Sequence, residues 1–224
     1  MAIGIVDVFL NAGVVSQYLP SIVASLGTTV ILAALIIIGG TVLGVLLAIA
    51  RNAHLKALSA LIVLYADLWR TLPPLVFIII VFFGAPYANI TISAFATTWL
   101  TLTIILSAYV EESVWSGIRA LDVGQYEAAR SSGLSWLQSM MYVVVPQAFR
   151  SMLGPITSRA VAITKDTALG SVIGLSEMLG VAQSAASNSG NPSPLTVTVV
   201  LYLAIFLPIV VTSRYLEKLW TWKR

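Results

Sequence analysis

The chain has 224 residues, of which 58% are hydrophobic and only 9% charged, with a mean hydropathy of +0.96 and a formal net charge of +3. A soluble domain carries about 25% charged residues, so this composition excludes an ordinary water-soluble protein and predicts an integral membrane protein. The chain has no cysteine and one histidine, His54, which excludes a disulfide framework, a thiolate metal site and most histidine-based catalytic schemes.

Five apolar runs are long enough to cross a bilayer as helices, which takes about 20 residues each. We therefore expect an all-α membrane protein with a single transmembrane domain over residues 1–224. The first residues lack the basic stretch of a secretory signal, so we expect no cleavable signal peptide. The predicted spans are residues 21–50, 58–84, 90–115, 140–164 and 195–213.

The second run is interrupted by charges and by proline. Asp67 and Arg70 lie one helical turn apart, where they can form a structural pair or line a pathway through the membrane. The dipeptide Pro73-Pro74 predicts that the helix breaks there, because proline has no amide N–H and clashes with the preceding turn. The freed carbonyl groups must then find protein partners or water.

The third run ends with Glu111 and Glu112, which point about 100° apart on a helix. These glutamates either meet other charges or reach water where the helix leaves the membrane. The linker after the fourth run is rich in serine, glycine and alanine, and we expect a short helix in it around residues 172–183.

The basic residues indicate the orientation of the chain in the membrane. They gather after the first, third and fifth runs, whereas the connection at residues 85–89 has no charge. Because lysine and arginine favour the cytoplasmic side, we expect the N-terminus outside and the C-terminus in the cytoplasm. The residues that carry this argument are Arg51, Lys56, Arg119, Arg130, Arg214, Lys218, Lys223 and Arg224.

A polar insert at residues 122–137 separates the third and fourth runs. Asp122 with Gln125, and Ser135 with Gln138, each have the spacing of a helix-initiating capping box. Gly133 between them can adopt the left-handed conformation that ends a helix. The insert is thus expected to form a helix, a sharp turn and a second helix. From its residues alone, it either rests on the lipid surface or docks onto a soluble partner.

Four motifs in this order resemble those of permease subunits of type I ATP-binding-cassette importers, in the branch that takes up polar amino acids. The insert and the run after it read EAARSSGLSWLQSMMYVVVPQAFR, which resembles E-A-A-x-x-x-G followed by L-P-Q-A-L-R. The flanking motifs are WRTLPPLV at residues 69–76, AYVEESVWSGI at residues 108–118 and KDTALGSVIGLSEML at residues 165–179. Together they cover the chain from about Gly27 to its C-terminus.

Three residues depart from the usual family pattern. Leu72 replaces a threonine before proline, Glu111 stands where alanine is usual, and Trp115 stands where arginine is usual. Glu112 occupies the place of the family's glutamate. The sequence assigns no role to Glu111 or Trp115.

The resemblance implies that the insert is a coupling helix, which docks into a groove on a cytoplasmic ATPase dimer. The chain has no G-x-x-x-x-G-K-[ST] phosphate loop, so ATP is expected on that partner, and this chain is expected to be a pore subunit without enzyme activity or a cofactor of its own. The coupling residues implied by the motif are Glu127, Ala128, Ala129, Arg130 and Gly133.

The resemblance also implies the other partners and the cellular location. We expect a second permease subunit (either another copy of this chain or a paralogue), an extracytoplasmic amino-acid-binding protein and an amino acid substrate, with no nucleic acid. The location implied is the bacterial cytoplasmic, or inner, membrane. A stand-alone secondary carrier or channel for a small polar solute is the alternative. Whether the amino acid is acidic, basic or an amide stays open.

The fourth span provides the candidate substrate contacts. The resemblance places Thr157, Ser158 and Arg159 on the substrate pathway, together with Asp67, Arg70 and Glu112 of the earlier spans. The guanidinium of Arg159 can hold a carboxylate with two hydrogen bonds. The alternative is an ion pair between Arg159 and Asp166, which lies on the same stripe if the helix continues. His54, in a short basic loop, is expected at the surface.

Overall fold

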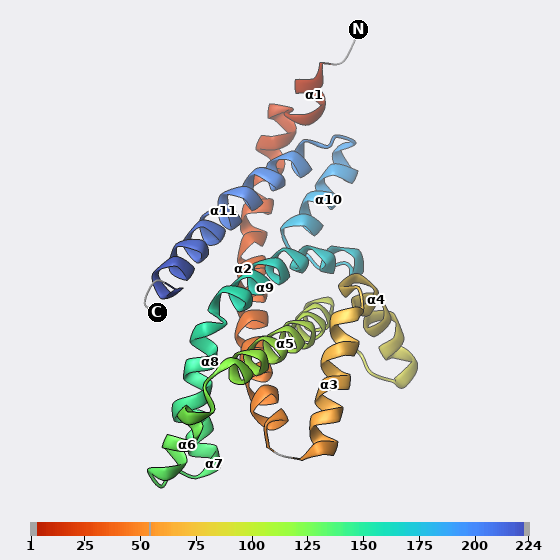
Figure 1. Cartoon of the computed structure of the whole chain (residues 1–224). Coiled ribbons are helices and arrows are strands. Elements are labelled where there is room, and N and C mark those ends of the chain that lie inside the picture. The colour runs from red at the N-terminus through yellow and green to blue at the C-terminus, as the bar shows by residue number, and fades with distance from the viewer. Residues whose placement is uncertain (1–3, 54, 222–224) are drawn as a thin grey trace. The chain divides into compact units, whose positions relative to one another are not determined.

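The computed structural model describes residues 4–53 and 55–221, and helices form all of the regular structure in this part of the chain (Figure 1). The expected surface position of His54 lies outside the described residues. The helices are α1 (Ile5–Phe9), α2 (Ala12–Arg51), α3 (Lys56–Thr71), α4 (Pro74–Gly84), η1 (Ala85–Ala88), α5 (Ala94–Ala120), α6 (Val123–Ser131), α7 (Trp136–Ser139), η2 (Met140–Val144), α8 (Val145–Ser151), α9 (Leu153–Asp166), η3 (Thr167–Ile173), α10 (Met178–Ser189) and α11 (Ser193–Thr221).

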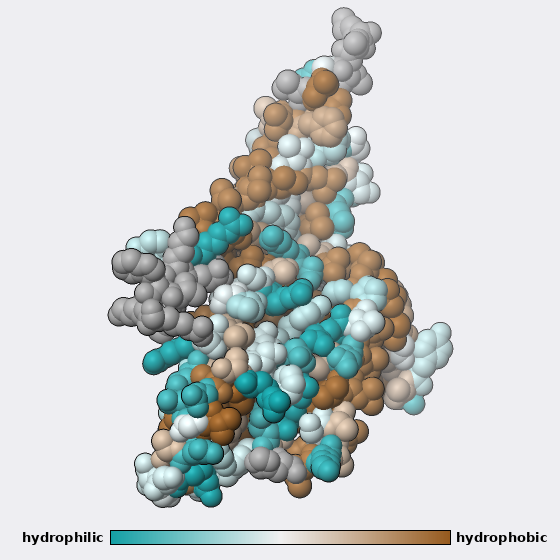
Figure 2. All heavy atoms as spheres, viewed as in Figure 1, coloured by the Kyte–Doolittle hydropathy of each residue, from teal (hydrophilic) through white to brown (hydrophobic). Residues whose placement is uncertain are grey.

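Three of the described helices are long and apolar enough to cross a membrane, at Asp7–Arg51, Ala94–Ala120 and Ser193–Thr212. The pair α3 and α4 makes a fourth if it is one broken span. Hydrophobic side chains cover much of the visible surface (Figure 2), and those of Val30, Ile38 and Leu203 are exposed. Such a surface suits lipid, because hydrocarbon solvates apolar side chains.

The break expected at Pro73-Pro74 is confirmed. Helix α3 ends at Thr71 and α4 begins at Pro74. Leu72 between them is extended, with φ −74° and ψ 132°, as the residue before a proline prefers.

The segment expected as the fourth span consists of several shorter helices. In η2 the amide of Val145 donates to the carbonyl of Met140, so one turn widens to π-helical geometry just before Pro146. Helix α8 then ends at Ser151. The backbone of the next residue, Met152, leaves helical geometry, and α9 follows. Five spans therefore stay a prediction.

The chain folds as two compact units, each described by itself. The first unit comprises Met1–Ile36, Pro74–Leu102 and Ile163–Val211. Its core contains Ile22 and Met178. Glu177 is fully buried and caps α10, because its carboxylate accepts a hydrogen bond from the amide of Gly180 at 2.7 Å. The same carboxylate also accepts a hydrogen bond from the hydroxyl of Tyr202 at 2.8 Å.

The short helix expected in the linker lies further along the chain than the sequence indicated. Gly174 has a left-handed φ of 82° and ends η3. The cap at Glu177 then starts α10 at Met178. The linker thus contains two short helices, with the turn between them inside residues 172–183.

The second unit comprises Ile37–Pro73, Thr103–Ala162 and Thr212–Arg224. Here α2 packs directly on α5 because glycine removes the side chains that would separate them. A Cβ atom at Gly40 would lie 2.8 Å from the Cβ of Leu106, and one at Gly44 would lie 2.6 Å from the carbonyl oxygen of Ser107. Such close backbone contact is the usual packing of small residues between membrane helices.

Candidate functional site

The polar insert forms an elbow, by which we mean α6, α7 and the turn between them. Asp122 is the N-cap of α6, and its carboxylate accepts a hydrogen bond from the amide of Gly124 at 2.7 Å. The capping box expected there is incomplete. The side chain of Gln125, its second member, accepts a hydrogen bond from the side chain of Gln147 instead. The box at Ser135 is complete, with both reciprocal bonds to Gln138.

Gly133 makes the turn of the elbow, as expected. Its φ is +86°, which L-residues with a side chain rarely adopt. Its amide donates to the carbonyl of Arg130 at 3.0 Å, and the next amide, of Leu134, donates to the carbonyl of Ala129 at 3.3 Å. This pair of bonds is the Schellman motif, which satisfies the last carbonyl groups of α6. The backbone therefore holds the angle between the two short helices.

The predicted coupling residues divide between the two sides of α6. Glu127, Ala128 and Arg130 are exposed, whereas Ala129 is buried. The inner side of the elbow is anchored by Tyr126 and Trp136, which pack against a buried cluster made of Ile49, Met140, Val144 and Val145. The outer side of α6 is thus an exposed polar surface, and the inner side of the elbow is packed against the buried cluster.

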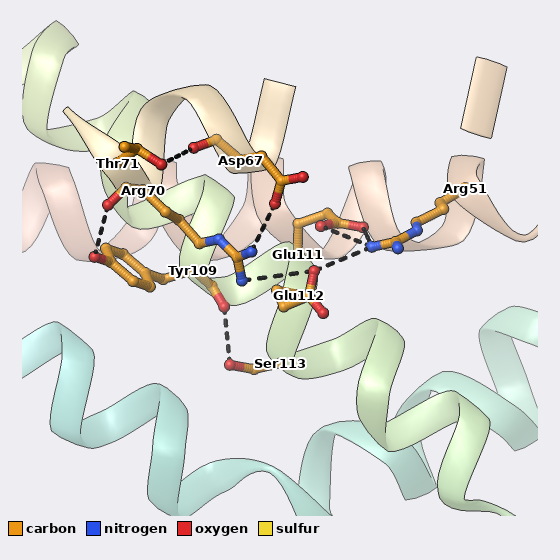
Figure 3. Close-up of polar contacts among 8 residues, drawn as sticks. All are labelled: Arg51, Asp67, Arg70, Thr71, Tyr109, Glu111, Glu112 and Ser113. Carbon is orange, nitrogen blue, oxygen red and sulfur yellow. Dashed lines mark hydrogen bonds and ion pairs between the residues drawn. The ribbon is translucent and has the colours of Figure 1, made fainter. Parts of the chain in front are cut away.

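A charged cluster lies in the same unit and joins three helices (Figure 3). Arg51 at the end of α2 contacts the carboxylates of Glu111 at 3.0 Å and Glu112 at 3.2 Å, both on α5. Arg70 on α3 contacts Glu112 at 3.6 Å and Asp67 at 2.8 Å. The Asp67–Arg70 pair that the spacing predicted is therefore present, but it is one end of a longer chain of alternating charges.

The two unexplained departures from the family pattern meet at Arg51. The Glu111 side chain is fully buried and that of Arg51 is 9% exposed. The Arg51 guanidinium also lies 3.7 Å from the centre of the Trp115 ring, a distance at which a cation is attracted to the face of the indole. Glu111 and Trp115 thus bind the same side chain, which the sequence marked only as a cytoplasmic flank.

Tyr109 connects this cluster to Arg159 of α9. The Arg159 guanidinium lies 4.1 Å from the centre of the Tyr109 ring, and the Tyr109 hydroxyl donates to the carbonyl of Arg70 at 3.4 Å. Tyr109 and Glu112 share a face of α5, because they are three residues apart. The structure therefore brings together four of the six predicted pathway residues: Asp67, Arg70, Glu112 and Arg159.

The other two predicted pathway residues, Thr157 and Ser158, make no part of this cluster in the described residues. The Thr157 hydroxyl donates to the carbonyl of Leu153 in its own helix, and Ser158 is exposed. The alternative pair of Arg159 with Asp166 stays a prediction, because these residues fall in different units. Sequence reasoning missed Tyr109 and Arg51. The spacing of Tyr109 from Glu112 was the one signal that could have found Tyr109.

The site offers charge and hydrogen bonds rather than metal ligands. Within the described residues, no three histidine, cysteine, aspartate or glutamate side chains gather to hold a metal ion. Each carboxylate of the charged cluster already faces an arginine. The cluster can therefore hold helices together or bind a group that carries both signs of charge.

Comparisons with known proteins agree with the motif order. Residues 40–221 match the family described as binding-protein-dependent transport system inner membrane component. A relative from Bacillus subtilis, described as "Probable glutamine ABC transporter permease protein GlnP", is 36% identical over 178 residues, which cover 78% of this chain and 82% of the relative. The arginine transport system permease protein ArtQ of the same organism is 27% identical, over 89% of this chain and 92% of the relative.

A solved structure is similar along nearly the whole chain. It is described as an amino acid ABC transporter with histidines, and it matches with a TM-score of 0.80 and 28% identity over 91% of this chain and 95% of that chain. These matches confirm the fold class and the family that the motifs indicated. The chain belongs to the binding-protein-dependent transport system inner membrane components, as a permease subunit of an ATP-binding-cassette importer with the type I fold.

Proposed function

We propose that this permease moves a polar amino acid into the cytoplasm when a partner ATPase pushes on the elbow. The observation that carries the proposal is the elbow itself, whose outer residues Glu127, Ala128 and Arg130 are exposed while Tyr126 and Trp136 anchor its inner side. A partner that presses on such a surface moves the helices to which it is anchored. The backbone hydrogen bonds at the Gly133 turn hold the angle between α6 and α7 while the partner presses on α6.

The relatives support an amino acid as the substrate. Those named above are described as glutamine and arginine permeases, and the similar solved structure as an amino acid transporter. Amino acids carry an ammonium and a carboxylate group, and the charged cluster together with the neighbouring Arg159 contains partners for both. Glu112 and Asp67 suit the ammonium, and Arg159 suits the carboxylate, because a guanidinium can bind carboxylate through two hydrogen bonds.

The other subunits of the proposed transporter are separate chains. ATP binds to a dimeric cytoplasmic ATPase, an extracytoplasmic protein delivers the amino acid, and a second permease subunit completes the pore. The elbow then faces the cytoplasm of a bacterial inner membrane, the N-terminus lies outside, and the five spans act as a single transmembrane domain. The basic residues Arg51, Arg119 and Arg130 on the elbow side support this orientation.

The test is co-purification of the ATPase with permease variants from membranes. Glu127→Lys reverses an exposed charge on α6, and Gly133→Trp places a bulky side chain at a backbone angle that glycine alone adopts easily. We expect both variants to lose the ATPase. The matched controls are Asp7→Lys, which makes the same charge change on exposed α1, and Gly84→Trp, where a Cβ meets nothing within 4 Å and φ is not positive.

The controls are expected to retain the ATPase. A permease that keeps the ATPase and full ATP-dependent uptake in both elbow variants contradicts the proposal. Uptake by the purified permease alone, driven by a proton or sodium gradient, would establish the secondary carrier instead.

The substrate contact has its own test. Arg159→Gln removes the positive charge while leaving a hydrogen-bonding side chain of moderate length. We expect transport, and the stimulation of ATP hydrolysis by the loaded binding protein, to fall by at least tenfold, since hydrogen bonds to charged groups contribute about 1.5–3 kcal/mol each. Unchanged uptake and unchanged stimulation would remove Arg159 from the pathway.

A further inference from the structure

The charged cluster holds α5 to its two neighbours in different ways. On the α2 side, Arg51 touches Glu111, Glu112 and the face of Trp115, and Glu111 is fully buried. The same two helices meet at glycines further along, where a Cβ on Gly44 would lie 2.6 Å from backbone. This contact between α2 and α5 is close-packed and charge-paired, so its separation would leave a buried carboxylate without a cation.

On the α3 side, two contacts differ along the helix: the Tyr65 hydroxyl lies 2.7 Å from the Ser107 hydroxyl in the middle of α3, whereas the ion pair at the end of α3 is longer and more exposed. Arg70 reaches Glu112 at 3.6 Å, and both side chains are about one third exposed, at 28% and 31%. Arg70 is closer to Asp67 of its own helix, at 2.8 Å. Helix α3 then ends within two residues, at the extended Leu72 before Pro73.

Glu112 is shared between two arginines from different helices, at 3.2 Å from Arg51 and 3.6 Å from Arg70. Each arginine also has a carboxylate of its own, because Glu111 stays with Arg51 and Asp67 stays with Arg70. The Glu112 carboxylate can therefore move wholly to Arg51 without leaving either arginine unpaired. Exchange of this kind avoids the large desolvation penalty of an isolated charge.

We propose that Arg51 and Glu111 form a permanent tie between α2 and α5, and that Glu112 is a switchable latch that releases Arg70, and with it the C-terminal end of α3, during the transport cycle. The proposal rests on the proposed function, because ATP-driven movement of the elbow supplies the cycle. Helix α5 leads into the elbow through Asp122. Movement of the elbow thus carries α2 and α5 together, while the end of α3 loses its ion pair with α5.

The absence of cysteine from the chain makes a direct test possible. Single pairs of introduced cysteines carry spin labels in the assembled complex with ATPase and binding protein, with one labelled permease subunit per complex. The tie is followed between Leu46 on α2 and Ser116 on α5, and the latch between Leu68 on α3 and Ser116. All three side chains are exposed. Pulsed electron spin resonance measures each distance without nucleotide and after trapping with ATP and vanadate.

We expect the Leu68–Ser116 distance to change on trapping while the Leu46–Ser116 distance stays constant. The variant Glu112→Gln should show the released Leu68–Ser116 distance even without nucleotide, because the amide no longer attracts Arg70, and it should leave the Leu46–Ser116 distance unchanged. The matched control is Arg119→Gln, which removes an exposed arginine 6.0 Å from the same Trp115 ring. It should preserve both distances in each state.

Every other result rules out the tie, the latch or the proposed function. A change in both distances on trapping rules out the tie, and constancy of both in a complex that traps nucleotide rules out the latch. A Glu112→Gln complex that behaves as the unmodified protein also rules out the latch. If the ATPase neither assembles with the permease nor traps nucleotide, the proposed function fails instead, and this is established before any distance is measured.

Discussion

The elbow and the charged cluster are both polar structures in a hydrophobic chain, but they are assembled from different ranges of sequence. The bonds that shape the elbow join near neighbours, such as the amide of Leu134 and the carbonyl of Ala129. The bonds of the cluster that cross between helices join residues 39 to 61 positions apart. The elbow exposes Glu127, whereas the cluster buries Glu111 completely. Local bonds therefore shape the exposed surface that we propose as the docking site of a partner, and distant bonds hold the helices together.

The largest effect expected is from Arg51→Met, which leaves the buried Glu111 without its cation. Removing one partner of a buried ion pair costs about 3 to 5 kcal/mol. We expect the free energy of unfolding, measured in mixed micelles with increasing sodium dodecyl sulfate, to fall by that amount. The double variant Arg51→Met with Glu111→Leu should recover most of it, because neither charge is then buried alone. A double variant as unstable as the single one would contradict this account of the tie.

Overpacking the contact between α2 and α5 should have the next largest effect. Gly44→Leu places a side chain where a Cβ already lies 2.6 Å from the Ser107 carbonyl oxygen. Overpacking of a tight core costs about 1 to 3 kcal/mol, measured by the same unfolding assay. Gly27→Leu in the same helix is the control, since a Cβ there meets nothing within 4 Å. Equal losses in the two variants would show that α2 and α5 do not meet closely at Gly44.

The elbow should respond more mildly, because its stability comes from local bonds. Ser135→Ala removes the hydroxyl of the capping box, which typically costs about 1 kcal/mol. Hydrogen exchange of the Gln138 amide, which donates to that hydroxyl, should accelerate about fivefold. Ser132→Ala is the control, because its hydroxyl donates to a carbonyl of the preceding turn, that of Ala128. Unchanged exchange at Gln138 in Ser135→Ala would mean that the cap is not formed.

The smallest effect is expected at the exposed end of the charged cluster. The Asp67 side chain is 59% exposed, and surface ion pairs contribute about 0 to 1 kcal/mol. Asp67→Asn should therefore change the free energy of unfolding by less than 1 kcal/mol, and the change should shrink in 1 M salt. A loss as large as that of Arg51→Met would mean that both ends of the cluster are equally buried in the membrane.

The difference between local and distant bonds also explains what the sequence predicted. The elbow, its Gly133 turn and the break at Pro73-Pro74 follow from short-range rules of helix capping and proline geometry, and the structure has all three. The prediction of the first capping box was incomplete, because one of its two residues forms a hydrogen bond with another helix instead. Asp122 caps α6, but Gln125 binds Gln147, which comes from a helix 22 residues further along.

The charged cluster could be predicted only in part, because no rule of spacing relates α2 to α5. Asp67 and Arg70 were paired correctly since they share one helix turn. Arg51 was interpreted as a flanking charge, because its two glutamates lie 60 and 61 positions away and no local rule relates them to it. Trp115 was unexplained for the same reason, since its partner is that arginine. Tertiary contact alone revealed why these residues occur together.

Photo-crosslinking from the elbow tests the central claim most directly. A photoreactive amino acid at Ala128, which is exposed on α6, is activated in native membranes that contain the whole transporter. We expect a covalent product with the ATPase, and none from the same probe at Tyr87, which is 93% exposed in the connection after α4. Products with lipid alone at Ala128, in membranes where the ATPase is present and active, would contradict the account.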